Sequence, residues 1–252
     1  MARRKVTRAI LVTGSGSGIG AAIVRRLAGP GAGILIHANH NKAGCARVAK
    51  DAEAKGASVR IALADLSKPG AGETLVKTAV KAFGRLDVLV SNAGFPSRRI
   101  IGEMKREELD YLYGAMLRGF FDLATAALPH LKKSLDGRVV TVSSHNAHVF
   151  RNDYLFYPGS GAIKAGVEAM TRAFAVQVAP HAVTVNSVVP GLIRKYEGPQ
   201  FLSEKEWRAL AKKVPLRRAG QADEVAALVQ FLCSKDAGYI TGQCIHINGG
   251  FI

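Results

Sequence analysis

The chain has 252 residues, which fits one α/β domain or two small ones and allows a large buried core. Apolar residues make up 48% of it, a content that excludes a disordered chain. No apolar run is long enough for a membrane span or a signal peptide, so we expect no membrane partner. The three cysteines, Cys45, Cys233 and Cys244, have no metal-ligand spacing, and their odd number favours reduced thiols, no metal and a cytoplasmic protein.

The formal net charge of +16 raises the question of a nucleic-acid partner. The basic residues are scattered in pairs, and no aromatic residues interleave with them to form a binding stripe: Arg25-Arg26, Lys132-Lys133, Lys212-Lys213 and Arg217-Arg218. We interpret these pairs as solvated helix faces and expect no nucleic-acid partner. A basic field still favours small ligands that carry phosphate or carboxylate groups.

The first predicted elements are a strand, a glycine-rich turn and a helix. The apolar run Ala9–Val12 predicts a buried strand, the turn Thr13–Gly20 follows, and apolar residues then recur at helical spacing through Leu27. Glycines let a ligand approach the main chain, and the free N–H groups of a helix start suit a pyrophosphate. The alternative is a purely structural turn, but its place at the first strand–helix junction favours a dinucleotide site.

The second predicted strand, Gly33–His37, ends without an acidic residue. A carboxylate at this position accepts hydrogen bonds from the adenosine ribose of NAD and repels the 2′-phosphate of NADP. The run His37–Lys42 contains Asn39 and His40 but no acid, and the next one is Asp51. The electrostatics therefore favour NADP. The alternative, in which Asn39 contacts a ribose hydroxyl of NAD, stays open.

Two further strands, Ser58–Leu63 and Leu86–Ser91, also end in polar or small residues. Asp65 follows the first and either hydrogen-bonds the adenine amine or, with Ser67, caps a helix that starts near Pro69. Asn92-Ala93-Gly94 follows the second. Alternating strands and helices predict a doubly wound parallel sheet with right-handed crossovers, whose strand ends line one crevice.

The motifs together resemble the short-chain dehydrogenase/reductase family, over almost the whole chain from Ala9 to Gly250. The matching motifs are Thr-Gly-x-x-x-Gly-Ile-Gly at 13–20, Asp65, Asn92-Ala93-Gly94, Pro190-Gly191, Ile240-Thr241-Gly242-Gln243 and Asn248-Gly249-Gly250. The resemblance implies a single-domain Rossmann fold with a seven-stranded parallel sheet, an NAD or NADP cofactor, and a homodimer or homotetramer. The expected cofactor-binding residues are Thr13, Gly14, Ser15, Ser17, Gly18, Ile19, Gly20, Asn39, His40, Asp65, Leu66, Asn92, Ala93, Gly94, Lys164, Pro190, Gly191 and Ile193.

The resemblance also places catalytic residues, and two of the usual four differ. Ser144, after the strand Arg138–Val142, matches the serine that hydrogen-bonds the substrate carbonyl, and Lys164 matches the ribose-binding lysine. Ser160 stands where the family has the tyrosine that exchanges the proton. Met116, in the long helix Glu107–Leu131, stands where the family has an asparagine that widens a helical turn and holds a relay water.

The stretch 145–159 is about three residues longer than is usual and carries two candidate substitutes for the proton donor. Tyr157 lies thirteen residues after Ser144, the family's common spacing, but seven before Lys164. Because Pro158-Gly159 disfavours a continuous helix there, we expect Tyr157 or Tyr154 to fold back over the crevice.

Downstream, Ile193 belongs to the loop expected to contact the nicotinamide carboxamide, Lys195 is the polar residue after it, and 195–213 forms a substrate lid. The leading interpretation is an NADP-dependent oxidoreductase that moves a hydride between nicotinamide and a small carbonyl or alcohol substrate. The alternative is a non-redox or catalytically degenerate member that keeps the cofactor cleft for binding, regulation or an isomerase or cyclase reaction.

Overall fold

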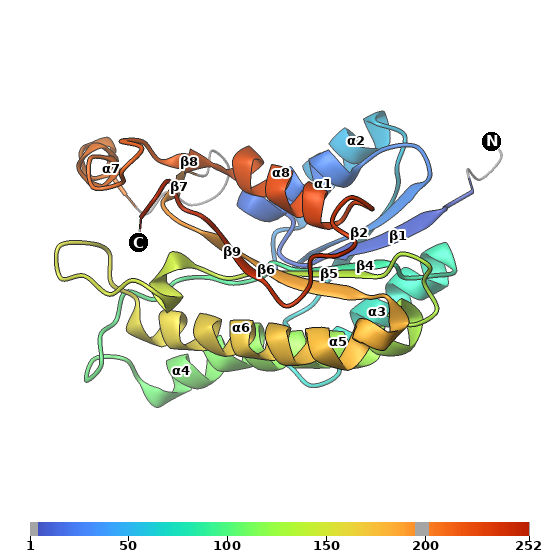
Figure 1. Ribbon diagram of the computed structural model, residues 1–252, viewed down its shortest axis with the longest axis horizontal. Helices are drawn as coiled ribbons and strands as arrows, with labels where there is room; N and C mark the ends of the chain where they lie inside the picture. The colour runs from blue at the N-terminus through green and yellow to red at the C-terminus, as the bar shows by residue number, and fades with distance from the viewer. Residues whose placement is uncertain (1–4, 195–201, 252) are drawn as a thin grey trace.

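A computed structural model describes residues 5–194 and 202–251, and its centre is a seven-stranded parallel sheet (Figure 1). The strand order is β3-β2-β1-β4-β5-β6-β9, so the chain reverses its direction of winding between β1 and β4. The strands are β1 (Arg8–Val12), β2 (Ala32–Ala38), β3 (Ser58–Leu63), β4 (Val88–Ser91), β5 (Arg138–Val142), β6 (Thr184–Pro190) and β9 (Cys244–Ile247). A short second sheet pairs β7 (Ile193–Arg194) with β8 (Gly220–Gln221). The predicted doubly wound fold is confirmed.

Helices cover both faces of the sheet (Figure 1). One layer holds α1 (Gly18–Leu27), α2 (Lys42–Ala54) and α8 (Ala222–Leu232). The other holds α3 (Ala71–Phe83), α4 (Arg106–Tyr113), α5 (Gly119–Leu131) and α6 (Pro158–Val178). The shorter α7 (Glu204–Ala211) lies at one end of the sheet, outside both layers.

Alternate residues of each strand supply the two cores. In β1, Ile10 and Val12 pack under α1 and α2, whereas Leu11 packs toward α3 and α5. These side chains are almost completely buried, as expected for a parallel sheet that is covered on both sides. Within the described residues, no helix is long and apolar enough to cross a membrane.

The predicted helix Glu107–Leu131 is divided by a widened turn. α4 ends at Tyr113, a π-helical turn covers Gly114–Arg118, and α5 then begins at Gly119. Met116 is buried in this turn and packs with Leu112 and Ile163. The turn is therefore widened although Met116 stands in the place of the asparagine. The thioether of Met116 still offers no strong hydrogen-bonding group for a relay water.

Candidate active site

The turn between β1 and α1 requires glycine at two positions. Gly14 has φ +62°, and a Cβ there would lie 2.8 Å from the Cα of Ala93. A Cβ on Gly20 would lie 2.4 Å from the carbonyl oxygen of Gly14. Ser17 precedes α1, but its side chain makes no capping hydrogen bond. The Ser17 hydroxyl therefore leaves the first N–H groups of the helix open to a ligand. This cradle fits the pyrophosphate of a dinucleotide.

Thr13 and Asn92 hold the turn against the end of β4. The Thr13 hydroxyl accepts hydrogen bonds from the backbone N–H groups of Asn92 and Ala93, both at 3.0 Å. The Asn92 side chain donates back to the carbonyl oxygens of Thr13 and Gly14, at 2.9 and 3.0 Å. These two predicted cofactor-site residues thus shape the site largely by bonding to each other.

His37, at the end of β2, holds the other side of the same turn. Its Nδ1 accepts a hydrogen bond from the Gly14 N–H at 3.2 Å, so the ring proton lies on Nε2, which contacts the Ala64 carbonyl at 2.9 Å. Burial holds the pKa of His37 below its usual value, although the bond to Ala64 opposes this effect. Ser15 is fully buried beside it, donating to the Val12 carbonyl and accepting from the His37 N–H.

The region at the ends of β2 and β3 is polar, as predicted. Asn39 donates to the Tyr111 hydroxyl at 3.2 Å, and the exposed His40 lies close enough to help hold the pKa of Asp65 down. Burial would raise the pKa of Asp65, but the hydrogen bonds from Ser67 and the charges of Lys68 and His40 together lower it. Leu66 is buried beside it.

The prediction that Asp65 or Ser67 caps the following helix is wrong. Asp65 accepts from the backbone N–H of Ser67 at 2.9 Å and so closes its own turn. α3 starts at Ala71, and the residue that precedes it is Gly70, with φ +77°. The chain needs the extra residues to turn before the helix, so neither polar side chain reaches its first N–H groups.

One cleft of about 410 Å³ brings most of the predicted site residues together at the C-terminal ends of the strands. Its predicted members are Gly14, Ser17, Gly18, Ile19, Gly20, Asn92, Gly94, Ser144, Tyr157, Ser160, Lys164, Pro190, Gly191 and Ile193. The predicted residues outside its lining are Thr13, Ser15, Asn39, His40, Asp65, Leu66 and Ala93. Thr13 and Ala93 contribute to the braces described above.

Ser144, Ser160 and Lys164 occupy defined positions in this cleft. The Ser144 hydroxyl follows β5 and accepts from the backbone N–H of Asn146 at 3.3 Å, which closes a short 3₁₀ turn over His145–Ala147. Lys164 donates from Nζ to the Val142 carbonyl at 2.6 Å. Ser160 lies one helical turn before Lys164, is buried, and accepts from the Ser97 N–H at 2.9 Å.

The two candidate tyrosines differ in position. Tyr157 immediately precedes α6 and lines the cleft. Tyr154 packs against Phe251, with ring centroids 4.3 Å apart, and its hydroxyl is buried without a hydrogen-bond partner among the described residues. Burial raises the pKa of Tyr154, and the nearby Tyr157 adds to that rise. Of the two phenols, the geometry favours Tyr157 as the one that meets a ligand.

The expectation that Pro158-Gly159 lies outside the helix is wrong. α6 begins at Pro158, where a fixed φ suits the first helical turn and the missing N–H costs nothing. Tyr157 itself has φ −137° and ψ 67°, outside helical geometry. Tyr157 is therefore the last residue before the helix, and Pro158 and Gly159 form the first helical turn.

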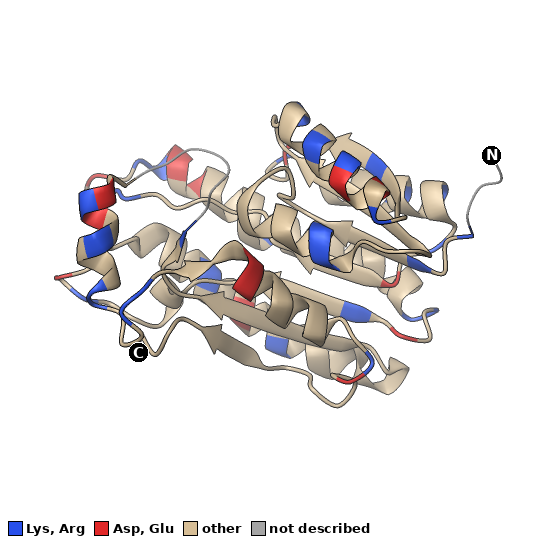
Figure 2. Ribbon diagram, turned by 90° about the horizontal axis from the view of Figure 1, so that it is seen from above, with Lys and Arg blue, Asp and Glu red and all other residues tan. Residues whose placement is uncertain are grey.

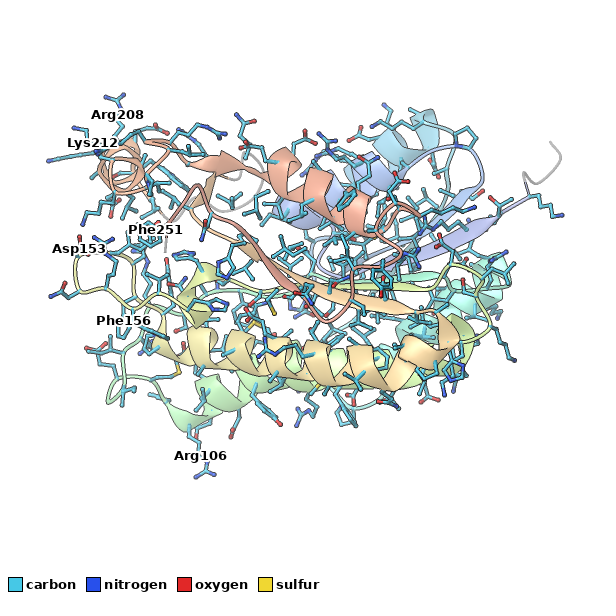
Figure 3. All side chains as sticks on the ribbon, viewed as in Figure 1. Arg106, Asp153, Phe156, Arg208, Lys212 and Phe251 are labelled. Carbon is cyan, nitrogen blue, oxygen red and sulfur yellow. The ribbon has the colours of Figure 1, made fainter. Side chains whose placement is uncertain are left out.

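One side of the cleft is lined by apolar side chains and by the guanidinium of Arg98. Leu155, Leu192, Leu202 and Trp207 line it together with Arg98. Trp207 comes from α7, which forms the described part of the predicted lid; Lys195 and the segment 195–201 lie outside the described residues. The Lys213 ammonium, just after α7, contacts the carboxylate of Asp153 at 3.4 Å. Figure 3 shows Phe251 between Arg208 of α7, with Lys212 just after the helix, and the loop that carries Asp153 and Phe156.

Sequence reasoning missed several of these residues. His37 carries a usable signal, because a histidine inside an otherwise apolar buried strand needs polar partners. Phe95 and Arg98 carry no such signal in the sequence. They lie in a loop without regular structure and reach the cleft only through the path of that loop.

The sheet order, the glycine cradle and the polar groups in one cleft define a dinucleotide-binding enzyme. Comparison with known proteins agrees. The family profile described as Enoyl-(Acyl carrier protein) reductase matches residues 14–252. The 3-oxoacyl-[acyl-carrier-protein] reductase FabG of Staphylococcus aureus is 34% identical over 246 residues, which cover 98% of each chain. A (2S)-[(R)-hydroxy(phenyl)methyl]succinyl-CoA dehydrogenase subunit, BbsD of Thauera aromatica, is 33% identical over 96% of each chain.

Solved structures give the same result. A short chain dehydrogenase from Burkholderia cenocepacia in complex with NADP has a TM-score of 0.88 and 31% identity, with 99% of each chain covered. A short-chain dehydrogenase/reductase from Serratia marcescens has a TM-score of 0.89 and 30% identity, again with 99% of each chain covered. The chain belongs to the short-chain dehydrogenase/reductase family and is an NAD(P)-dependent oxidoreductase.

The buried, neutral His37 predicts a loss of stability in mild acid. Its pKa is lowered on folding, so the unfolded chain binds the extra proton first, and stability falls as the pH drops below the ordinary histidine value of about 6.5. We expect His37→Gln, which removes the ionisable group, to reduce the dependence of the urea midpoint on pH between about 7.5 and 5.5. The slope is reduced rather than abolished, because the pKa values of His145 and His246 are lowered too. Identical slopes for wild type and variant would contradict the assignment.

Proposed function

We propose that this protein is a cytoplasmic, NADP-dependent oxidoreductase that interconverts a carbonyl and an alcohol. The observation that carries the proposal is the single cleft in which the glycine turn, Ser144, Tyr157 and Lys164 meet. The NADP preference is supported by the absence of any acid between His37 and Lys42. The cytoplasmic location is supported by three cysteines that are all unpaired.

The residues of the cleft divide the chemistry among them. When bound, the nicotinamide gives a hydride to the carbonyl carbon or takes one from the alcohol carbon. The Ser144 hydroxyl donates to the carbonyl oxygen, and Tyr157 gives the proton that turns this oxygen into a hydroxyl. Lys164 would donate to the ribose hydroxyls of the bound cofactor. Tyr157 thus does the work for which Ser160 is too short and too weak an acid.

We propose a 3-oxoacyl or 3-hydroxyacyl thioester as the substrate class. Relatives of this chain are named for 3-oxoacyl-[acyl-carrier-protein] and for a hydroxyacyl-CoA. The wall formed by Leu155, Leu202 and Trp207 suits an acyl chain or an aromatic acyl group. Arg98 at the same wall, in a protein of net charge +16, favours the anionic part of a thioester carrier.

The cofactor preference is tested by titration. We expect NADPH to bind more tightly than NADH, and Ala38→Asp to reverse the preference by about tenfold or more, because its carboxylate repels the 2′-phosphate. Ala38→Asn is the matched control, since it has the same size without the charge. Tighter binding of NADH to the wild type, measured by fluorescence titration, would show that the charge argument is wrong.

The proton donor is tested by removing one hydroxyl at a time. Tyr157→Phe is expected to lower kcat by about two to four powers of ten with little change in NADPH affinity, because the general acid is lost. Tyr154→Phe is the matched control: it removes a phenol from the same loop but outside the cleft lining. Full activity of Tyr157→Phe on 3-oxoacyl thioesters would exclude that residue as the donor. Ser160→Tyr is expected to raise activity on simple ketones by restoring the Tyr-x-x-x-Lys pair.

We also propose that the protein is a homodimer or homotetramer. Tyr113 and Phe121, on α4 and α5, are about half exposed, and β9 ends the main sheet with an unpaired edge. We expect light scattering at micromolar concentration to give a dimer or tetramer and Phe121→Glu to shift it toward smaller species. A monomeric wild type would remove the proposal.

A further inference from the structure

The three candidate catalytic residues come from three separate elements, which must be held in fixed relation. Ser144 follows β5, Tyr157 ends the loop between β5 and α6, and Lys164 lies in α6. A misplacement of about 1 Å at such a site can cost a factor of 100 in rate. The buried carboxylate of Glu168, itself on α6, bonds to the residue before Ser144 and to the start of the loop that leads to Tyr157.

Glu168 lies in α6 one turn after Lys164, and its side chain is only 3% exposed. Its Oε1 accepts a short hydrogen bond from the hydroxyl of Ser143, the residue before Ser144. The same oxygen accepts from Nε2 of His148 at 2.9 Å. His148 follows the 3₁₀ turn at the start of the loop that leads to Tyr157. Glu168 therefore joins its helix to the end of the catalytic strand and to the beginning of the loop.

The partners of the Glu168 carboxylate stabilise it, because burying an anion costs free energy unless the anion is paired and hydrogen-bonded. The Arg172 guanidinium is 4.0 Å away, is more than half exposed, and also donates to the Cys244 thiol. His148 lies closer, and the ring of His246 packs against it with centroids 4.6 Å apart. The hydrogen bonds that join the carboxylate to the strand end and to the loop come from Ser143 and His148, and the Cys244 thiol also hydrogen-bonds to it.

The cluster does not form a second nucleophilic or metal site. Ser143 and His148 both bond to Glu168 rather than to each other, so the serine has no histidine base to activate it. Within residues 5–194 and 202–251, no three histidine, cysteine or acidic side chains are arranged to hold a metal ion. The hydrogen bonds of the cluster instead connect the elements that carry the candidate catalytic residues.

We propose that Glu168 is a positioning residue, and that its bridge between Ser143 and His148 holds Tyr157 in register with Ser144 and Lys164. The proposal rests on the proposed function. It assigns a role to a histidine and a glutamate that do not line the cleft, and it explains how a phenol delivered by a long loop keeps a fixed place there.

The test uses His148→Ala and Glu168→Gln, with Arg172→Gln as the matched control. Arg172 touches the same carboxylate but connects to Cys244 on β9 and not to the catalytic loop. We expect kcat to fall by about tenfold to a hundredfold in the first two variants, with KM for NADPH within about twofold of the wild type. The double variant is expected to be no worse than the worse single one, because one bridge is broken in each. His148→Gln, which restores an N–H donor, is expected to recover part of the loss.

Hydrogen–deuterium exchange of the protein without cofactor supplies a readout that is independent of turnover. Peptides covering 145–157 are expected to exchange faster in His148→Ala and Glu168→Gln but not in Arg172→Gln. Unchanged kcat and unchanged exchange would overturn the proposal, as would an equal loss in the arginine control. If Glu168→Gln fails to fold, Ser143→Ala breaks the other arm of the bridge and is expected to lower kcat. If Tyr157→Phe is fully active while the exchange changes as expected, the assignment of Tyr157 as the proton donor fails and the bridge through Glu168 stands.

Discussion

The structure depends on one tight junction, the turn between β1 and α1, which lies so close to the end of β4 that no Cβ fits at Gly14. A Cβ on Gly14 would meet Ala93 at 2.8 Å, so the backbone of the turn is pressed against the end of β4. Hydrogen bonds hold it there from both sides, from Thr13 and Asn92 on the β4 side and from His37 on the β2 side. The junction lies where the sheet changes its winding direction, and the cleft opens at that point.

This arrangement leaves the half of the cleft at the glycine turn fixed by backbone geometry and the half that holds Ser144, Tyr157 and Lys164 fixed by side chains. The glycine turn needs only that the strands pair in register, whereas Ser144, Tyr157 and Lys164 have to be brought together from the sheet, a loop and a helix. The fold therefore tolerates a change in the position of the proton donor more easily than it tolerates a change in the glycine turn. Figure 2 shows Lys and Arg scattered over the molecule rather than gathered in one patch, with acidic and basic residues mixed on α7.

Sequence patterns predicted the strands and most helices because each has a clear apolar period, and the strand ends that form the cofactor cradle follow from them. They did not predict that α6 starts at Pro158, because proline and glycine mark both turns and helix starts. They did not predict the brace by His37, which exists only once β2 lies between β1 and β3. The bridge through Glu168 could not be predicted for the same reason, since its partners His148 and Ser143 are 20 and 25 residues away in the chain.

The central claim is that the cleft carries out hydride transfer in spite of the serine at position 160. The most direct measurement follows the label from NADPH deuterated at the nicotinamide C4 during turnover of short 3-oxoacyl thioesters. The account predicts deuterium on the carbinol carbon of the product, detected by NMR, together with a slower rate for the labelled cofactor when chemistry limits turnover. Tight binding of NADPH with no deuterium in any product would contradict it and would support a non-redox use of the cleft.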